Sequence, residues 1–300
     1  MIAPPYLKPG DKVAIVATAR KVSFTEMEPA IRVLKAWGLT VITGNNLTAE
    51  DNQFAGTDWE RASDMQQMLD DPEMRAIFCA RGGYGSVRII DRLDFTRFVA
   101  SPKWIVGYSD ITVFHSHISR HFGIETLHGT MPINFPIDGS ENPSVSSLRK
   151  ALFGEEVQYT FPGHPLNRKG PAWGQLIGGN LSILYSLSAT ASDFETDGKI
   201  LFIEDVDEYL YHIDRMMMNL KRSGKLGKLA GLIVGGMTKM NDNTIPYGHT
   251  AEEIISNAAA EYGYPVCFNF PAGHQDKNYA LIVGREAELS VNENTTLRFS

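Results

Sequence analysis

The chain has little of several features that mark other protein classes. Its 300 residues contain only two cysteines, Cys79 and Cys267, each in an apolar run and neither in a Cys-x-x-Cys pair. This usage favours buried free thiols in a reducing compartment over a disulfide framework. No apolar run approaches the roughly 18 residues that a membrane span needs, so we expect no membrane partner.

Positive charge is also in short supply. The formal net charge is −7, which argues against a nucleic-acid partner because such proteins neutralise phosphates with basic side chains. The first ten residues hold no basic region followed by an apolar stretch. We therefore predict that the chain carries no signal peptide and is cytoplasmic.

Nucleotide-binding fingerprints are missing as well. The glycine-rich segment Arg81–Gly85 fails the dinucleotide pattern, because the sixth position counted from Gly83 is Arg88, and no Gly-Lys-Ser/Thr follows for a P-loop. Its glycines could point backbone N–H groups at an anion, or could only form a turn with unusual dihedral angles. Arg81 could pair with a ligand carboxylate or cap the helix that follows.

What the chain does have is the composition of a globular protein, with 43% hydrophobic and 21% charged residues. In the first half, short apolar runs alternate with helical patterns, which predicts a parallel α/β sheet. These runs are Lys12–Ala17, Leu39–Ile42, Ala76–Ala80 and Trp104–Val106. Later runs predict more strands at Ile200–Ile203, Gly231–Val234 and Pro265–Phe268, and a hairpin around residues 292–294.

Between Gly154 and Gly174, prolines and glycines predict an irregular connection and a domain boundary. We expect an N-terminal α/β domain over residues 1–153, with a Rossmann-like or flavodoxin-like parallel sheet. A linker over residues 154–172 would lead to a smaller C-terminal α/β domain over residues 173–300. Ligands of such sheets bind beyond the carboxyl ends of the strands.

A serine stands at one of these strand ends. Trp104–Gly107 reads as a strand followed by a tight turn, and Ser109 precedes a helical segment. This is the arrangement of a nucleophile elbow, although the usual second glycine is absent. The helix end offers N–H groups and partial positive charge that favour an oxyanion. Ser109 could equally be only a turn or N-cap residue.

An acid and a base follow two later strands. Four carboxylates lie between Glu204 and Glu208, and Glu204 comes directly after an apolar run. They could bind a metal, orient a histidine or be solvated. His274 follows another apolar run, in a turn suited to a general base, or is an ordinary surface histidine. The order Ser109, Glu204, His274 is one in which catalytic triads occur.

Seven segments of the chain, in their order along the sequence, resemble motifs of the serine LD-carboxypeptidases, the family of murein tetrapeptide carboxypeptidase and the microcin C immunity protein. The resemblance spans nearly the whole chain, with Thr130 where the family has proline. The matching segments are Leu7–Asp11, Ala80–Gly85, Val106–Asp110, His128–Met131, Trp173–Leu181, Glu204–Asp205 with Tyr211–Arg215, and Pro271–His274.

The resemblance implies roles for five residues. Ser109 would be the nucleophile, His274 the base and Glu204 its orienting acid. The backbone N–H groups of Gly83 and Asp110 would form the oxyanion hole, with one donor from the glycine loop and one from the residue after the serine. No metal or organic cofactor would be required.

The implied reaction removes the terminal D-alanine from murein tetrapeptides during peptidoglycan recycling, through an acyl-enzyme. Its partner would be a small peptide substrate, and the protein would be a cytoplasmic homodimer. Candidate substrate contacts are Arg81, Tyr84, Trp173 and Glu208. One alternative is an immunity-type hydrolase of peptidyl or aminoacyl nucleotides, for which Trp173 could be an aromatic platform. Another is a muropeptide-binding protein without catalysis.

Overall fold

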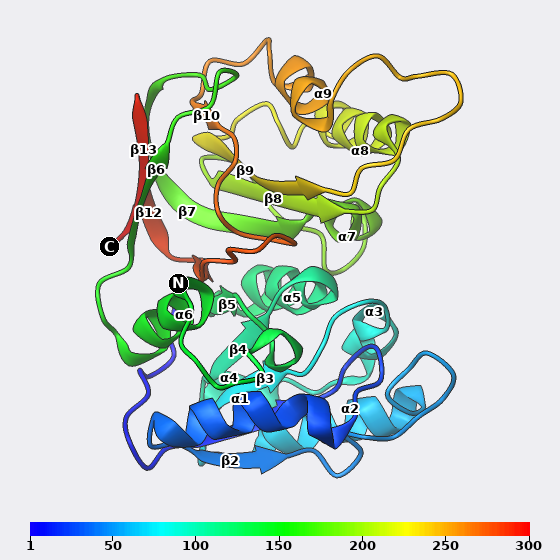
Figure 1. Cartoon of the computed structure of the whole chain (residues 1–300), viewed down its shortest axis with the longest axis vertical. Helices are drawn as coiled ribbons and strands as arrows, with labels where there is room; N and C mark the ends of the chain where they lie inside the picture. Colours follow the sequence, from blue (N-terminus) through cyan, green and yellow to red (C-terminus); the bar gives the residue numbers. More distant parts are fainter.

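Two sheets, one above the other, form the frame of the protein (Figure 1). The computed structural model describes residues 1–300. The first sheet has the strand order β11-β5-β4-β3-β1-β2. Its strands are β1 (Lys12–Val16), β2 (Thr40–Thr43), β3 (Met74–Cys79), β4 (Trp104–Gly107), β5 (Thr126–His128) and β11 (Leu281–Val283). All neighbours in it are parallel except β11, which is antiparallel to β5.

The second sheet has the order β10-β9-β8-β7-β12-β13-β6. The β7–β8, β8–β9 and β9–β10 pairs are parallel, and the β6–β13, β13–β12 and β12–β7 pairs are antiparallel. Its strands are β6 (Gln158–Pro162), β7 (Gly170–Asn180), β8 (Ile200–Val206), β9 (Gly231–Thr238), β10 (Val266–Cys267), β12 (Glu286–Val291) and β13 (Asn294–Phe299).

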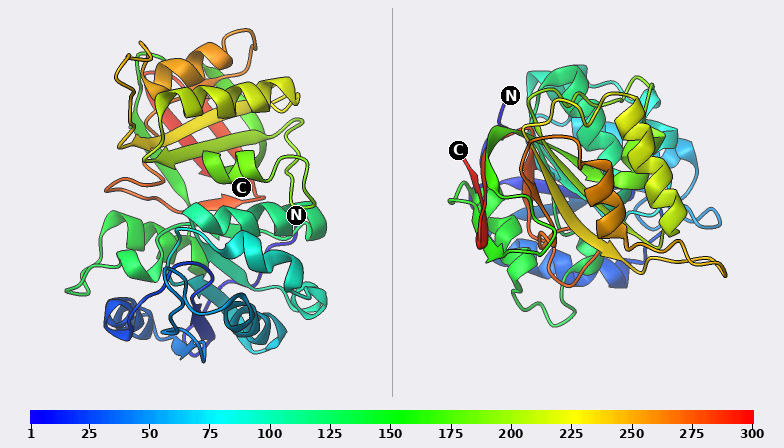
Figure 2. Two further views of the ribbon diagram at one scale, coloured as in Figure 1. Left: turned by 90° about the vertical axis from the view of Figure 1, so that its right-hand side faces the viewer. Right: turned by 90° about the horizontal axis from the view of Figure 1, so that it is seen from above.

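Helices cover the sheets (Figure 2). The α-helices are α1 (Phe24–Ala36), α2 (Asp58–Asp70), α3 (Ser86–Ile89), α4 (Thr96–Ala100), α5 (Thr112–Phe122), α6 (Pro143–Phe153), α7 (Leu181–Ser186), α8 (Leu210–Arg222) and α9 (Ala251–Ala258). Short 3-10 turns are η1 (Ile90–Arg92), η2 (Ser109–Ile111) and η3 (Pro132–Asn134). Helices α1, α2 and α9 each begin with a capping box that satisfies exposed backbone N–H groups. No helix has both the length and the apolar character to cross a membrane.

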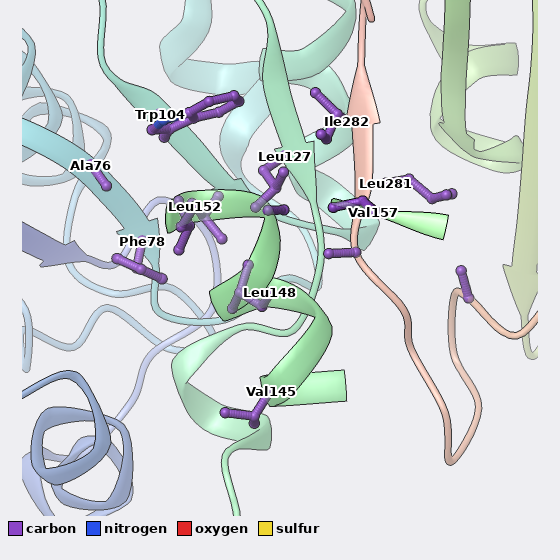
Figure 3. Close-up of a cluster of buried hydrophobic side chains, with 14 of the residues drawn as sticks. Ala76, Phe78, Trp104, Leu127, Val145, Leu148, Leu152, Val157, Leu281 and Ile282 are labelled. Atoms are coloured by element: carbon purple, nitrogen blue, oxygen red, sulfur yellow. The ribbon is translucent and has the colours of Figure 1, made fainter. Parts of the chain in front are cut away.

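Alternate residues of the strands point to different cores. In β3, Ala76 and Phe78 pack with residues of α1 and α6, while Ile77 and Cys79 face α2 and α5. Figure 3 shows the first of these cores, with Phe78 of β3 near Leu148 and Leu152 of α6, and Trp104 on the neighbouring strand β4. The same cluster continues into β7, β8 and β12, so the two sheets share one apolar core. This continuity fixes the strand ends of the two sheets relative to each other.

The α/β architecture with a mostly parallel first sheet and a second sheet is confirmed. The hairpin around residues 292–294 joins β12 to β13 as predicted. Two details differ from the sequence-based expectation. The stretch 154–172 contains β6 and the start of β7, because alternating Tyr159 and Phe161 are buried against the core. In addition, β11 returns from the C-terminal part to the first sheet. The division into domains stays a prediction.

Candidate active site

Ser109 lies on a sharp turn between β4 and α5. Its φ of 63° is in the left-handed region that side chains rarely adopt, and the residue is half-buried. Gly107 permits this turn, because a Cβ there would lie 2.7 Å from the Ile111 side chain. Strained backbone of this kind presents the serine of a nucleophile elbow. The turn has the backbone geometry of the elbow expected from the sequence, and the role of Ser109 as nucleophile stays a prediction.

The glycine loop after β3 packs against this serine. A Cβ on Gly82 would lie 2.9 Å from Cβ and 3.1 Å from Oγ of Ser109, and 3.5 Å from the backbone nitrogen of Asp110. Only glycine leaves room for this approach. Gly83 has a φ of 110° and its residue is exposed. The loop backbone thus packs closely against Ser109, and the oxyanion-hole role of Gly83 stays a prediction.

The Asp110 side chain ties the two turns together. It is fully buried, and its Oδ2 accepts a hydrogen bond of 2.8 Å from the backbone N–H of Ser86, the first residue of α3. Ser86 in turn lies 3.2 Å from the hydroxyl of Thr18. Burial raises the pKa of Asp110, against the lowering effect of these hydrogen bonds. The elbow and the glycine loop are therefore held as one unit.

Glu204 and His274 form a buried pair. His274 Nδ1 lies 2.7 Å from Glu204 Oε2, which also accepts the His274 backbone N–H at 3.1 Å. Glu204 is 0% exposed and His274 is 20% exposed. Burial lowers the pKa of His274, but the hydrogen bond and charge of Glu204 outweigh it, so the net pKa is raised. Because a carboxylate only accepts, Nδ1 carries the proton, and Nε2 is the nitrogen available for proton transfer.

His274 lines an open cleft of about 760 Å³ together with Tyr108, the residue directly before Ser109. The cleft is lined from the first sheet by Tyr108 and Asn134, and from the second by Val206, Thr238 and His274 among others. The Tyr108 ring lies 4.9 Å from the His274 ring. Burial raises the pKa of Tyr108 to about 12, so its hydroxyl stays protonated. The Ser109 hydroxyl and His274 are not hydrogen bonded to each other. Catalytic hydrogen bonds are often long or poorly aligned until substrate binds, so this does not argue against a general-base role for His274.

Two side chains that position His274 escape sequence reasoning. Thr238, at the end of β9, donates a hydrogen bond of 2.7 Å to the His274 carbonyl. Asn278 Oδ1 accepts the backbone N–H of Gly273 at 2.8 Å. Gly273 itself must be small, because a Cβ there would lie 2.7 Å from the Glu204 side chain. No motif in the sequence marks either residue, because Thr238 contacts a segment 36 residues away and Asn278 acts within one irregular loop.

The four predicted substrate contacts lie on three different parts of the fold. Arg81 is half-buried at the base of the glycine loop, and Tyr84 in that loop packs on Phe54 at 6.0 Å between ring centres. Glu208 lies 2.6 Å from His212 and is part-exposed. Trp173 is 57% exposed and pairs with Glu288, so it is not a core residue.

The fold does not bring Trp173 to the site. Asn180, at the carboxyl end of β7, is the neighbour of Glu204 in the sheet. Trp173 lies seven residues earlier on the same strand, which is roughly 20 Å at the rise of a β-strand. This separation is not predicted by the sequence. Trp173 lies near the start of β7, whereas the end of β7 is the part that neighbours Glu204.

The structure gathers no group of three or more His, Cys, Asp or Glu side chains that could hold a metal ion. The chemistry that these elements can offer is that of the Ser109 hydroxyl, the His274 imidazole and the Glu204 carboxylate. A histidine held by a buried carboxylate can act as a general base, and a serine at a helix start can act as a nucleophile.

Comparison with known proteins gives consistent matches. Residues 13–129 match the family model of the LD-carboxypeptidase N-terminal domain, and residues 173–289 match that of the C-terminal domain. The chain is 35% identical to the "Probable murein peptide carboxypeptidase" of Bacillus subtilis, over 98% of this chain and 93% of that protein. It is 30% identical to the murein tetrapeptide carboxypeptidase of Pseudomonas aeruginosa, over 94% of each.

Solved structures agree. The muramoyltetrapeptide carboxypeptidase of Oxalobacter formigenes superposes with a TM-score of 0.87 at 27% identity, over 96% of this chain and 98% of that one. The microcin C7 self immunity protein MccF, in complex with aspartyl sulfamoyl adenosine, has a TM-score of 0.86 at 22% identity, over 100% and 99%. This second likeness shows the fold alone. On the two family models and the relatives that match over nearly the whole chain, the protein belongs to the LD-carboxypeptidase family.

Proposed function

We propose that the protein is a serine-type LD-carboxypeptidase that removes the terminal D-alanine from murein tetrapeptides. The observation that carries the proposal is the Glu204–His274 pair, at 2.7 Å, with His274 packed at 4.9 Å against the ring of Tyr108, the residue before Ser109. Family membership supports a peptidase. Relatives named for murein peptides support the substrate class.

In the first step, His274 Nε2 takes the proton of the Ser109 hydroxyl while Oγ attacks the carbonyl carbon that precedes D-alanine. Glu204 keeps the Nδ1 proton in place and stabilises the imidazolium that forms. The negative charge on the former carbonyl oxygen is directed at the backbone N–H groups of Gly83 and Asp110.

In the second step, the intermediate collapses and the C–N bond breaks. His274 gives its proton to the nitrogen of the leaving D-alanine, and the acyl group stays on Ser109. Water then enters, loses a proton to His274 and attacks the ester. The peptide, now one residue shorter, leaves with a free carboxylate, and the proton returns to Ser109.

The direct test is mass spectrometry of a murein tetrapeptide after incubation with the purified protein. The wild type is expected to release D-alanine and leave the tripeptide, and Ser109→Ala is expected to leave the tetrapeptide intact. Equal release by both proteins would remove the nucleophile role from Ser109. A peptide left whole by the wild type would contradict the substrate assignment, and binding without cleavage would favour a muropeptide-binding protein.

The immunity-type reaction is a separate outcome of the same test. An aminoacyl sulfamoyl nucleotide offered beside the tetrapeptide is expected to stay uncleaved. The proposed platform for its base, Trp173, is at the opposite end of β7 from the neighbour of Glu204. Cleavage of the nucleotide and not of the peptide would favour the immunity-type reaction instead.

A cytoplasmic location and a homodimer belong to the same proposal, because the family resemblance implies both. Light scattering on the purified protein is expected to give twice the chain mass of 33.3 kDa. A mass of one chain would contradict the homodimer.

A further inference from the structure

The catalytic proposal leaves one buried carboxylate of the site without a role. Asp205 follows Glu204 on β8 and is 1% exposed. Its neighbour Glu204 bonds to His274, whereas Asp205 bonds to the carboxyl end of β7 and the start of α7. Two adjacent carboxylates therefore hold different structural elements.

Four donors converge on Asp205, of which the Ser182 hydroxyl, at 3.5 Å, is the most distant. Its Oδ1 accepts hydrogen bonds of 2.9 Å from the Asn180 side-chain amide and from the backbone N–H of Val206. Its Oδ2 accepts the backbone N–H of Ser182 at 2.8 Å. Burial and the charge of Glu204 raise the pKa of Asp205 to about 7, while these bonds act to lower it. Both oxygens serve only as acceptors, which is the pattern of a carboxylate.

Asn180 passes this constraint to the first domain. Its backbone N–H donates a hydrogen bond of 3.0 Å to Oγ1 of Thr112. Thr112 is the first residue of α5, three residues after Ser109, and is fully buried. Figure 1 shows α5 lying directly under β7 and α7 at the junction of the two sheets.

The glycine before Asn180 permits this contact. Gly179 has a φ of 148°, and a Cβ there would lie 2.5 Å from Oγ1 and 2.9 Å from Cγ2 of Thr112. The approach of β7 to α5 is therefore built into the sequence Gly178-Gly179-Asn180. This segment is part of the family-like stretch Trp173–Leu181, which has no role in the catalytic steps proposed above.

We propose that Asp205 is a positioning residue that acts through Asn180 and Thr112 to hold the nucleophile helix of the first domain against the acid and base of the second. Glu204 fixes His274, and Asp205 fixes the start of α5, which directly follows the turn η2 that carries Ser109. The inference rests on the proposed function, because it concerns the alignment of the same triad. Misplacement of a reacting atom by about 1 Å can lower a rate about a hundredfold.

A pair of variants at Thr112 isolates the contact. Thr112→Val keeps the shape and removes the acceptor, and Thr112→Ser keeps the acceptor. We expect Thr112→Val to lower kcat on the tetrapeptide by about tenfold to a hundredfold, with KM within about twofold. Thr112→Ser is expected to restore kcat to within about threefold of the wild type. A purely structural role would lower the melting temperature without separating kcat from KM in this way.

Ser116→Ala is the matched control. Ser116 lies one turn further along α5 and donates a hydrogen bond of 2.5 Å to the carbonyl of Ser192, in the connection between α7 and β8. Its loss also removes a contact between the domains, but not one to Asn180. We expect kcat within about twofold of the wild type. An equal fall in Ser116→Ala and Thr112→Val would overturn the specific role of Thr112.

A second measurement separates this inference from the proposed function. A fluorophosphonate that labels activated serines needs Ser109 and His274 but no murein peptide. The labelling rate of Thr112→Val is expected to fall in parallel with kcat. A wild type that is labelled at Ser109 but spares the tetrapeptide would contradict only the substrate, and the Thr112 pair would still be read from labelling.

Asp205→Asn tests the other end of the chain of contacts. An amide in place of the carboxylate turns one of its accepting oxygens into a donor that faces another donor. We expect the same loss of kcat and of labelling rate as in Thr112→Val. Full activity in a folded Asp205→Asn protein, or in Thr112→Val, would overturn the proposal.

Discussion

The exchange Glu204→Gln tests the acid of the proposed triad with the least change in shape. Glu204 Oε2 accepts two hydrogen bonds from His274, and Oε1 is buried without a partner. An amide oxygen in place of Oε2 would keep both bonds and lose the charge. An amide nitrogen there would meet Nδ1–H and force the other tautomer, with its proton on Nε2 facing Ser109.

The size of the effect follows from these two orientations. A hydrogen bond to a charged group is worth about 1 to 1.5 kcal/mol more than a neutral one. Two such bonds amount to about 2 to 3 kcal/mol, or about a hundredfold in rate. The wrong tautomer in a serine protease triad costs about 10⁴ in kcat. We therefore expect kcat/KM of Glu204→Gln to fall between about a hundredfold and ten-thousandfold.

Glu208→Gln is the matched control, because the chain offers a second Glu–His pair. Glu208 is 2.6 Å from His212, with side chains 23% and 27% exposed. This pair shares no hydrogen bond with the Glu204–His274 pair, so we expect kcat/KM to fall less than in Glu204→Gln. Steady-state release of D-alanine measures both variants. A loss in Glu208→Gln that exceeds the loss in Glu204→Gln would move the orienting role to Glu208.

The pH profile gives the same prediction a direction. Glu204 outweighs burial and raises the pKa of His274, and a general base must be neutral to act. The kcat/KM of the wild type is expected to fall with decreasing pH through a pKa above the ordinary 6.5 of histidine. In Glu204→Gln the charge is gone, so this limb moves to lower pH. A limb that stays in place would refute the coupling of the two residues.

Two further predictions follow from the same geometry. Gly82→Ala is expected to lower kcat at least about tenfold in a folded protein, because its Cβ would lie 3.1 Å from Ser109 Oγ. Gly263→Ala is the control and should leave kcat unchanged, because a Cβ at Gly263 would have no neighbouring atom within 4 Å. Comparable kcat values in the two variants would contradict the close packing of the loop. His115 is fully buried between Thr126 and the Gly107 carbonyl, and burial lowers its pKa to about 4. Between pH 6.5 and pH 4, His115 is therefore protonated in the unfolded chain and neutral in the folded protein. The free energy of unfolding consequently decreases as the pH falls through this range. Relative to His115→Gln, the wild type should lose about 1.4 kcal/mol of unfolding free energy per pH unit in this range, measured by urea titration; parallel pH profiles would contradict this.

The sequence predicts much of the site, because local patterns mark strand ends. Ser109 and His274 each follow a strand or apolar run, and parallel strands bring their carboxyl ends to one edge. Glu204 does not follow a strand as expected from the sequence. It lies within β8, which continues to Val206. That position aims the side chain more rigidly than a loop would.

The features that escape prediction depend on contacts between distant segments. Strand β11 joins the first sheet only because β5 offers an open edge. The contact of Asn180 with Thr112 joins residues 68 positions apart. No periodicity within a single segment carries this information.

Peptide mapping by mass spectrometry after fluorophosphonate treatment tests the central claim, that His274 activates Ser109, most directly. We expect one label per wild-type chain, on the peptide that contains Ser109, and no label in Ser109→Ala. His274→Ala is expected to react at least about a hundredfold more slowly, because the hydroxyl loses its base. A label on another serine, or equal labelling of the wild type and His274→Ala, would contradict the account.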